Sequence, residues 1–394
     1  MKINQSIVRL ISFLVFGILV LWSCRKEEII IPPTYTQVTK GVSVSPIKES
    51  IKGFYLLNEG NMGSNKCTLD YFDYETGKYV KNIYAYRNPG VVKELGDVGN
   101  DIQIYDNKIF CVINCSNFIE VMDSKAKHIT QISIPNCRYI RFKNDFAYVS
   151  SYAGPVAINS NARKGYVFKI DLNSWKVEDS CVVGYQPEEL EIIGDKLYVV
   201  NSGGYTSLNY DNTVSVIDLK TFTETKKIEV AINLHGIEQV GNDKLYISSR
   251  GDYNTVSSQT YIINTKDDTV SEFPESLPNT NMSHFKDSLY LYSSDWSSKT
   301  NKTTISYALV NTQQDLILAK NLIKDGTDVD IKIPYGIAVN PETKDFFVTD
   351  AGNYVTPGTL YCFDKDGIKK WEVITGDIPA HIAFTTVRLE GLFN

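Results

Sequence analysis

Short apolar segments recur along the chain in groups of four, and the clearest group lies near its middle. Glu189–Ile193, Leu197–Asn201, Thr213–Asp218 and Thr225–Val230 each carry Val, Ile, Leu or Thr residues in the spacing of half-buried strands. The loop between the second and third segments is rich in Gly, Asn and Tyr, and it is too polar to lie in a core. The pattern predicts a four-stranded antiparallel sheet with one long loop.

The same four-strand unit recurs through most of the sequence. Its second strand carries an aromatic residue, and neighbouring copies lie between 38 residues (Phe110 to Tyr148) and 57 residues (Tyr290 to Phe347) apart. The equivalent aromatic residues are Tyr55, Phe110, Tyr148, Tyr198, Tyr246, Tyr290 and Phe347. Repeated units of four short strands with this period are typical of propeller blades. We therefore predict an all-β fold, a seven-bladed β-propeller over residues 51–394.

The two ends of the repeat region complement each other. The first unit has only three predicted strands, Gly53–Asn58, Cys67–Tyr74 and Tyr79–Tyr84. At the C-terminus one strand is left over, Pro379–Thr385, and it matches the innermost strands of the other units. We predict that this strand completes the first blade as a three-plus-one clasp, which removes a free sheet edge.

The N-terminal segment has the features of a targeting signal. Residues 1–23 begin with a positively charged region that contains Lys2 and Arg9, followed by an apolar run about half as long as a membrane span. Leu21-Trp22-Ser23-Cys24 resembles the lipobox of bacterial lipoproteins, in which the cysteine is lipidated; the alternative is an ordinary secretory signal. Lys26-Glu27-Glu28 resembles the surface-export signal of Bacteroides-type lipoproteins, against a plain periplasmic tether. We expect lipidation at Cys24, a tether over 24–50, and an outer-membrane location facing the cell exterior.

Charge and cysteine content narrow the classes of partner. The formal net charge is −6, and removal of Lys2 and Arg9 with the signal would make it −8, which argues against nucleic acid as a partner. No other apolar run approaches the length of a membrane span, so we expect membrane contact through the lipid only. Six cysteines follow Cys24 without a CxxC pair, so a zinc site is not expected. Cys115 and Cys137 are the best candidates for a disulfide, and buried free thiols are an equal alternative.

The long loops between second and third strands should all emerge on one face of a propeller, and they are rich in aromatic and amide side chains. The predicted ligand-binding residues are Asn58, Glu59, Asn61, Tyr152, Asn201, Tyr205, Tyr210, Arg250, Tyr253, Trp296, Asp350 and Tyr354. Aromatic rings beside adaptable amides suit a large, partly polar ligand or a protein surface. The alternative is that these loops pack only on one another. His235 and His381 begin inner strands and could face the central channel or the binding face.

Motifs for catalysis are missing from the sequence. It holds no G-x-S-x-G, no H-E-x-x-H and no G-x-G-x-x-G after a strand. Nothing selects a third metal ligand to join His235 and His381. We therefore predict a protein that is not an enzyme and has no catalytic residue, metal or cofactor. Propeller lyases and lactonases assemble their sites from dispersed residues, so a lyase or lactonase is an alternative.

The sequence of the blades resembles a known family. LYVVNSGGY, TVSVIDLKT, LYISSRGD and IPYGIAVNPET are similar to the YncE-type propellers over nearly all of Gly53–Thr385. Within that group, NEGNMGSN, KELGDVGNDIQIY, GYQPEEL and TGDIPAHIAF resemble the BtuG surface lipoproteins. This resemblance implies a lipid-anchored propeller that captures cobalamin or another corrinoid and delivers it to a TonB-dependent, BtuB-like receptor in the outer membrane. The alternative is a surface glycan-binding or protein-scaffolding propeller of a nutrient uptake system.

Overall fold

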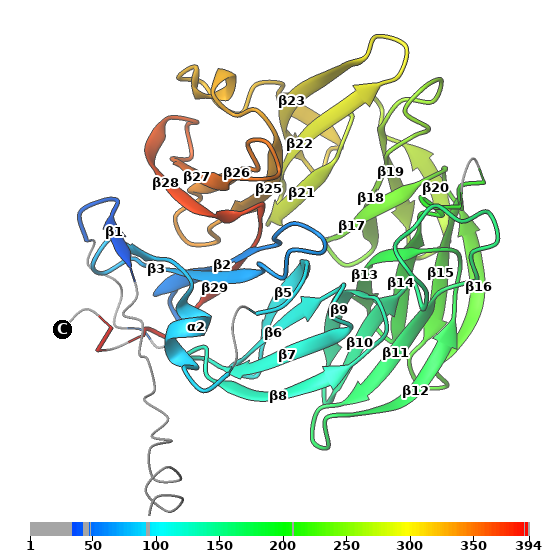
Figure 1. The fold of residues 1–394 in the computed structure, drawn as a ribbon. Helices are drawn as coiled ribbons and strands as arrows, with labels where there is room; N and C mark the ends of the chain where they lie inside the picture. The colour runs from blue at the N-terminus through cyan, green and yellow to red at the C-terminus, as the bar shows by residue number, and fades with distance from the viewer. Residues whose placement is uncertain are drawn as a thin grey trace, which may run out of the picture.

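Seven antiparallel sheets are arranged around a central axis (Figure 1). The computed structural model describes residues 34–41, 47, 49–91, 95–206, 209–389 and 391–392. The predicted signal segment and the lipidation site Cys24 lie outside these residues. Neighbouring innermost strands contact one another around the whole ring, from β5 to β29 and back to β5. The predicted all-β, seven-bladed β-propeller is confirmed.

Blades two to seven each consist of four strands that follow one another in sequence. Blades two and three comprise β5 (Gly99–Tyr105), β6 (Lys108–Ile113), β7 (Phe118–Asp123), β8 (His128–Ser133), β9 (Cys137–Lys143), β10 (Phe146–Ser151), β11 (Tyr166–Asp171) and β12 (Lys176–Val182). Blades four and five comprise β13 (Pro187–Ile193), β14 (Lys196–Asn201), β15 (Thr213–Asp218), β16 (Thr223–Glu229), β17 (Leu234–Val240), β18 (Lys244–Ser249), β19 (Gln259–Asn264) and β20 (Thr269–Glu272). Blades six and seven comprise β21 (Asn281–Phe285), β22 (Ser288–Ser297), β23 (Lys302–Asn311), β24 (Leu316–Ala319), β25 (Pro334–Val339), β26 (Phe346–Asp350), β27 (Pro357–Phe363) and β28 (Lys369–Asp377).

Blade one joins the two ends of the chain. Its strand order is β1-β4-β3-β2-β29, built from β1 (Tyr35–Gln37), β2 (Gly53–Asn58), β3 (Thr68–Asp73), β4 (Lys78–Val80) and β29 (Pro379–Thr385). The C-terminal strand β29 pairs antiparallel with β2. The predicted clasp is therefore confirmed. The predicted tether over 24–50 contributes an additional outer strand, because β1 pairs with β4.

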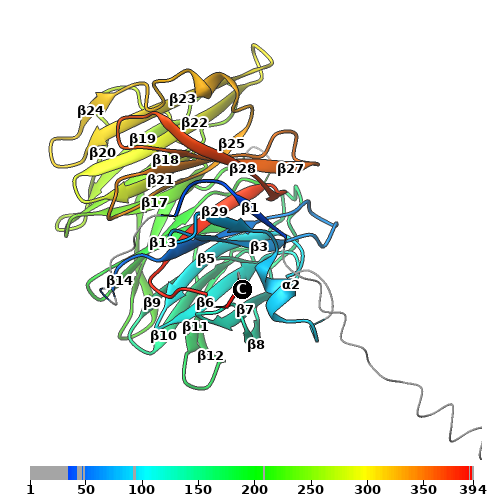
Figure 2. The same ribbon diagram turned by 90° about the vertical axis from the view of Figure 1, so that its left-hand side faces the viewer.

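One predicted strand of blade one is wrong in its second half. The segment Tyr79–Tyr84 leaves the sheet after Val80, and the short helix α2 (Ile83–Arg87) follows beside β3 (Figures 1 and 2). Asp70 causes the turn, since its carboxylate accepts hydrogen bonds from the Tyr79 hydroxyl at 2.7 Å and from the Asn82 backbone amide at 2.8 Å. Asn82 then caps the helix through a hydrogen bond from the backbone amide of Ala85 to its side chain.

Aromatic side chains fill the spaces between neighbouring blades. The seven equivalent aromatics predicted from the repeat are all buried: Tyr55, Phe110, Tyr148, Tyr198, Tyr246, Tyr290 and Phe347. At the closure of the ring, Phe54 of blade one packs against Phe347 of blade seven with ring centroids 5.0 Å apart. Phe72 stacks on Trp371 at the same distance. Full burial of a ring of this size contributes about 1.5–3 kcal/mol, so the joint between first and last blades is a well-packed core.

Blade six differs from its predicted shape. The polar segment Ser293–Thr303 predicts the long loop of this blade, and that prediction is wrong, because β22 and β23 continue through the segment and pair as far as Ser297 with Lys302. Trp296 therefore lies on a long projecting hairpin, opposite Thr303, and is 41% exposed. Polar residues had indicated a loop here, yet a solvent-exposed hairpin needs no apolar alternation.

The six cysteines of the propeller are free thiols, so the proposed Cys115–Cys137 disulfide is wrong. Cys137 is buried, and its sulfur lies within hydrogen-bond distance of the carbonyl oxygens of Ile113, at 3.6 Å, and Phe118, at 3.4 Å. Burial raises the pKa of Cys137 to about 12.

Within the described residues, no helix is long and apolar enough to cross a membrane.

Candidate binding site

A cavity of about 470 Å³ opens at one end of the central channel. Each of the seven long loops or hairpins contributes to its wall, as predicted for a face on which these loops converge. The contributing residues are Glu59, Cys115, Val156, Tyr205, Arg250, Ser294 and Tyr354. The predicted residues Glu59, Tyr205, Arg250 and Tyr354 thus lie together.

The floor of the cavity comes from the innermost strands. Each inner strand presents a polar side chain near its first residues, where it enters the channel. These side chains are Asn100, Arg138, Glu188, His235, Asn281, Tyr335 and His381. Of these, the sequence indicates only His235 and His381 as side chains that could face the channel or the binding face. Alignment of the inner strands by their second residue could have found Asn100, Arg138, Glu188 and Tyr335, because charged and amide side chains are unusual on strands buried at the axis of a ring.

Three predicted residues have structural roles at the ends of second strands. Asn58 and Asn201 are fully buried and end β2 and β14. The Asn58 amide donates to the hydroxyl of Thr68 at 3.0 Å, and the Asn201 amide donates to the hydroxyl of Ser215 at 3.0 Å. Asp350 ends β26, and its carboxylate accepts hydrogen bonds from backbone amides of the preceding connection. These side chains hold the loops and do not line the cavity.

The other five predicted residues do not line the cavity. Tyr152 is buried and Tyr210 is half-buried. Tyr253 and Trp296 are exposed on the outer rim, 37% and 41% respectively. Asn61 donates a hydrogen bond from its side-chain amide to the carbonyl oxygen of Tyr354 and so fixes the rim.

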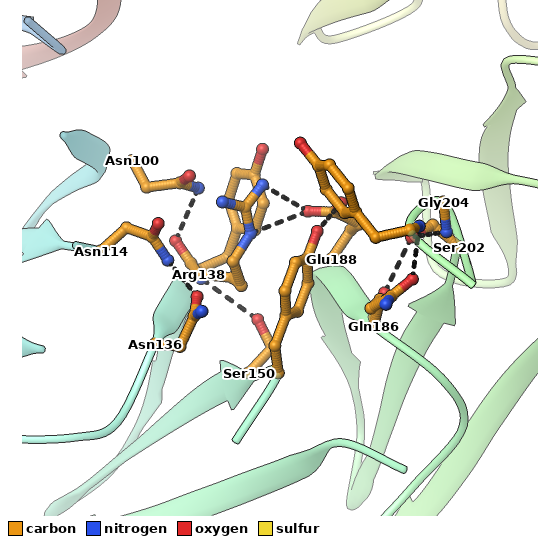
Figure 3. A network of polar contacts seen from close by, with 12 residues as sticks. Asn100, Asn114, Asn136, Arg138, Ser150, Gln186, Glu188, Ser202 and Gly204 are labelled. Atoms are coloured by element: carbon orange, nitrogen blue, oxygen red, sulfur yellow. Dashed lines mark hydrogen bonds and ion pairs between the residues drawn. The ribbon is translucent and has the colours of Figure 1, made fainter. Parts of the chain in front are cut away.

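A buried ion pair joins blades three and four beneath the rim (Figure 3). Arg138 donates from Nε and Nη2 to Glu188 Oε2, at 3.1 and 2.9 Å. The Tyr152 hydroxyl donates to the other carboxylate oxygen of Glu188, and the Tyr152 ring lies 4.7 Å from the guanidinium of Arg138. Asn100 donates to the backbone carbonyl of Arg138 at 2.9 Å. The charge of Arg138 is therefore matched within the protein, and its orientation is fixed.

A second polar group lies on the opposite wall. The Tyr335 hydroxyl donates to Glu59 Oε2 at 2.7 Å, and His381 Nε2 lies 3.8 Å from Glu59 Oε1. Burial alone would lower the pKa of His381, but Glu59 and the carboxylate of Asp101 raise it above its ordinary value. The negative charge of Glu59 is thus partly matched by its neighbours.

A further layer of charges lies deeper in the channel. Arg141 donates to Glu191 at 2.8 Å and to Asp101 at 3.3 Å. Glu189 accepts from the backbone amide of Ile237 at 3.1 Å. Burial raises the pKa of Glu189 to about 7, although the charge of Arg141 opposes the shift. The described residues contain no group of three or more His, Cys, Asp or Glu side chains arranged to hold a metal ion.

The raised pKa of Glu189 predicts a stability that falls as pH rises. Between the ordinary value of 4.5 and the folded value of about 7, the folded state binds the proton more tightly, so unfolding becomes easier toward neutral pH. Because one pKa unit corresponds to about 1.36 kcal/mol, we expect Glu189→Gln to stabilise the protein by about 1–3 kcal/mol at pH 8 and by little at pH 4.5. Urea unfolding at both pH values measures this. Glu229→Gln, at an exposed strand end, is the control, and an equal effect of both substitutions would contradict the assignment.

Comparison with other proteins agrees with the fold and adds a family. The seven sheets and the C-terminal clasp place the protein in the class of seven-bladed β-propellers. The chain belongs to the family described as Domain of unknown function (DUF5074), whose model matches residues 52–384. A search of curated proteins finds no match.

Solved structures share the architecture at low identity. A putative 6-phosphogluconolactonase from Bacteroides fragilis is 11% identical, with 86% of this chain and 99% of that chain covered and a TM-score of 0.58. A hypothetical selenium-binding protein from Sulfolobus tokodaii is 11% identical, with 86% and 95% covered and a TM-score of 0.58. A quinonprotein alcohol dehydrogenase-like protein from Bacteroides thetaiotaomicron is 16% identical, with 84% and 78% covered and a TM-score of 0.56. These likenesses concern the fold alone.

Proposed function

We propose that this protein binds cobalamin or a related corrinoid in the cavity at the channel mouth. The observation that carries the proposal is an open, mostly polar cavity with tyrosines on opposite sides of its rim. Tyr205 belongs to blade four and Tyr354 to blade seven, three blades apart in a ring of seven, and they are 36% and 43% exposed. A corrin is a wide, nearly planar ring edged with amides. Such a ligand suits a cavity that has tyrosine side chains at its rim and hydrogen-bonding side chains in its floor.

Both rim tyrosines are held in place by the loops that carry them. The backbone amide of Tyr205 donates to the side-chain carbonyl of Gln186 at 2.7 Å, and its carbonyl accepts from Asn159 at 2.8 Å. The backbone amide of Tyr354 donates to the carbonyl of Ala351 at 2.9 Å, and its ring lies 5.9 Å from that of Tyr335. Rings that are already ordered lose little conformational entropy on binding, which favours high affinity.

The amide and carboxylate groups of the floor would meet the amide edge of the corrin. Asn100 and Asn281 line the cavity beside Glu188 and Glu59. Such groups recognise amides by hydrogen bonds. A ligand that buried these groups without offering them hydrogen bonds would lose about 1–3 kcal/mol of binding free energy for each unpaired group. Binding of this kind requires no catalytic step, metal or cofactor from the protein.

The proposed cellular role follows from the proposed lipid anchor. Lipidation at Cys24 and the acidic residues after Lys26 would hold the propeller on the outer membrane, facing the exterior. The protein would then capture a corrinoid and deliver it to a TonB-dependent, BtuB-like receptor. Radiolabelled lipid on the wild-type chain, absent from Cys24→Ala, tests the anchor independently of the ligand.

Substitution of the rim tyrosines tests the site. We expect Tyr205→Ala combined with Tyr354→Ala to weaken cyanocobalamin binding at least about 30-fold, equivalent to about 2 kcal/mol, because tyrosine side chains often supply a large share of binding energy. Quenching of intrinsic fluorescence in the purified full chain measures the affinity. Tyr35→Ala, at an exposed position of outer strand β1, is the matched control. Unchanged affinity in the double variant would exclude this cavity as the corrinoid site.

A surface glycan-binding or scaffolding role is the second candidate. Trp296 and Tyr253 favour it, since both are exposed beyond the cavity and their segments are joined by a hydrogen bond from the Ser298 amide to the Tyr253 carbonyl at 2.9 Å. Exposed rings on one rim suit the stacking of a sugar. Binding on a glycan array, lost in Trp296→Ala and with cobalamin inactive, would favour this function over corrinoid capture.

A further inference from the structure

The cavity contains one cation that the described protein leaves without a partner. Arg138 is paired with Glu188, and Glu59 is bonded to Tyr335. Arg250 also lines the cavity, and its guanidinium makes no hydrogen bond or ion pair with any residue that the structure describes. Burial alone would lower the pKa of Arg250, but the charge of Glu188 raises it, and the Glu188 carboxylate is already bound to Arg138. A guanidinium that is partly removed from water and has five unmatched donors favours a bound anion.

Hydrogen bonds order the backbone around Arg250, so its side chain begins at a defined point of the cavity wall. Arg250 follows directly after β18, and its backbone amide donates to the carbonyl of Asn233 at 3.0 Å. The side chain of Asn233 donates to the carbonyl of Gly251 at 2.9 Å. Asp252 then accepts hydrogen bonds from the backbone amides of Asn254 and Val256, both at 2.8 Å. Arg250 therefore projects from an ordered turn, which suits a preorganised site.

His235 supplies a second unmatched polar group in the same blade. It lies on β17, lines the cavity and is only 8% exposed. Its Nδ1 atom is buried without a hydrogen-bond partner among the described residues. His235 follows Leu234, which pairs with Ser249, the residue before Arg250, so His235 and Arg250 lie on either side of one register pair of β17 and β18. Burial lowers the pKa of His235, and the charge of Arg250 lowers it further, which favours the neutral imidazole. A neutral imidazole can donate one hydrogen bond to the anion that a guanidinium holds.

We propose that Arg250 and His235 form a subsite for the phosphodiester of the bound ligand. This inference rests on the proposed corrinoid function. The carboxyl side chains at the edge of a complete corrinoid are amidated, and its one anionic group outside the metal centre is the phosphodiester of the nucleotide loop. A guanidinium fork matches two phosphate oxygens, whereas the neighbouring Arg138 is already committed to Glu188. The subsite would orient the corrinoid with its nucleotide loop over blade five.

The test compares cyanocobalamin with dicyanocobinamide, which lacks the phosphodiester, ribose and base, on the full chain purified in detergent. We expect Arg250→Gln to weaken cyanocobalamin binding about 10- to 100-fold, as for a charge-assisted hydrogen bond pair. The same substitution should leave dicyanocobinamide affinity unchanged within about twofold. Cobinamide phosphate, which keeps the phosphate and lacks the base, should respond as cyanocobalamin does. Arg87→Gln, on helix α2 outside the cavity, is the matched control.

The measurements distinguish a failure of the phosphodiester subsite from a failure of corrinoid binding as a whole. Equal losses for cyanocobalamin and dicyanocobinamide in Arg250→Gln would overturn the phosphodiester subsite and leave corrinoid binding intact. If neither corrinoid binds the wild-type chain, the corrinoid function fails, and thermal stabilisation by millimolar inorganic phosphate decides the subsite alone. Stabilisation that Arg250→Gln or His235→Phe abolishes would support an anion site, and no stabilisation would overturn it.

Discussion

A chain that ends at residue 378 is expected not to fold into a stable propeller. The deletion removes β29, which pairs with β2 from Gly53 opposite Thr385 to Asn58 opposite Pro379. It also removes Phe384, whose ring lies 6.1 Å from Phe54 and 6.0 Å from Phe347 at the closure of the ring. Among the described strands of blade one, β29 alone comes from the far end of the sequence, so its loss opens both a sheet edge and an aromatic core. We expect the destabilisation to exceed about 5 kcal/mol, comparable with the whole stability of many domains.

Thermal unfolding followed by circular dichroism measures the effect of this truncation. Thr36→Pro is the control, because it disturbs β1, the other edge of the same sheet, where the strand is exposed on all three residues. We expect that substitution to cost less than about 1 kcal/mol, in the range of ordinary surface changes. A truncated chain that melts cooperatively within a few degrees of the full chain would show that the clasp does not hold the ring together.

Glu188→Ala is expected to give the largest loss of stability among single substitutions in the channel. The Arg138 side chain is 14% exposed and that of Glu188 is 2% exposed, so the substitution leaves a nearly buried cation without its counter-ion. Tyr152 loses the acceptor of its hydroxyl at the same time. Breaking a buried pair by removing one partner costs about 3–5 kcal/mol, and we expect a loss in this range.

A double variant separates the cost of the unpaired charge from the value of the pair. Arg138→Met with Glu188→Leu removes both charges and keeps similar volumes, so it should recover most of the stability that Glu188→Ala loses. Urea unfolding without ligand measures both variants. If Glu188→Ala loses less than about 1 kcal/mol, water in the open cavity screens Arg138 and the pair is not structural.

The blades could be predicted from the sequence because their signal is repeated. Seven buried aromatics at similar spacing, and one missing strand matched by one surplus strand, leave few other folds. Local features with a single occurrence were missed. The turn that ends β4 depends on the side chain of Asp70 from the neighbouring strand β3, and the residues of the turn itself carry no pattern that predicts it. The long hairpin that carries Trp296 is polar, so periodicity gave no sign of its strands.

The candidate site was predicted from loops, and half of it comes from strands. Glu59, Tyr205, Arg250 and Tyr354 line the cavity as members of the loop face. Asn201, however, was chosen for its amide, and the structure uses that amide to hold the backbone inside the blade. Glu188, in contrast, reads in the sequence as one of two adjacent strand carboxylates. Only the ring geometry brings it opposite Arg138, which lies fifty residues earlier in the chain.

Calorimetric titration of the purified full chain with cyanocobalamin tests directly whether this propeller binds corrinoids. We expect a saturable heat with one corrinoid bound per chain, a Kd below about 1 μM, and the colour of the corrinoid retained on the protein after gel filtration. The absence of both heat and retained colour, from a chain that unfolds cooperatively, would contradict the proposal that this propeller captures corrinoids.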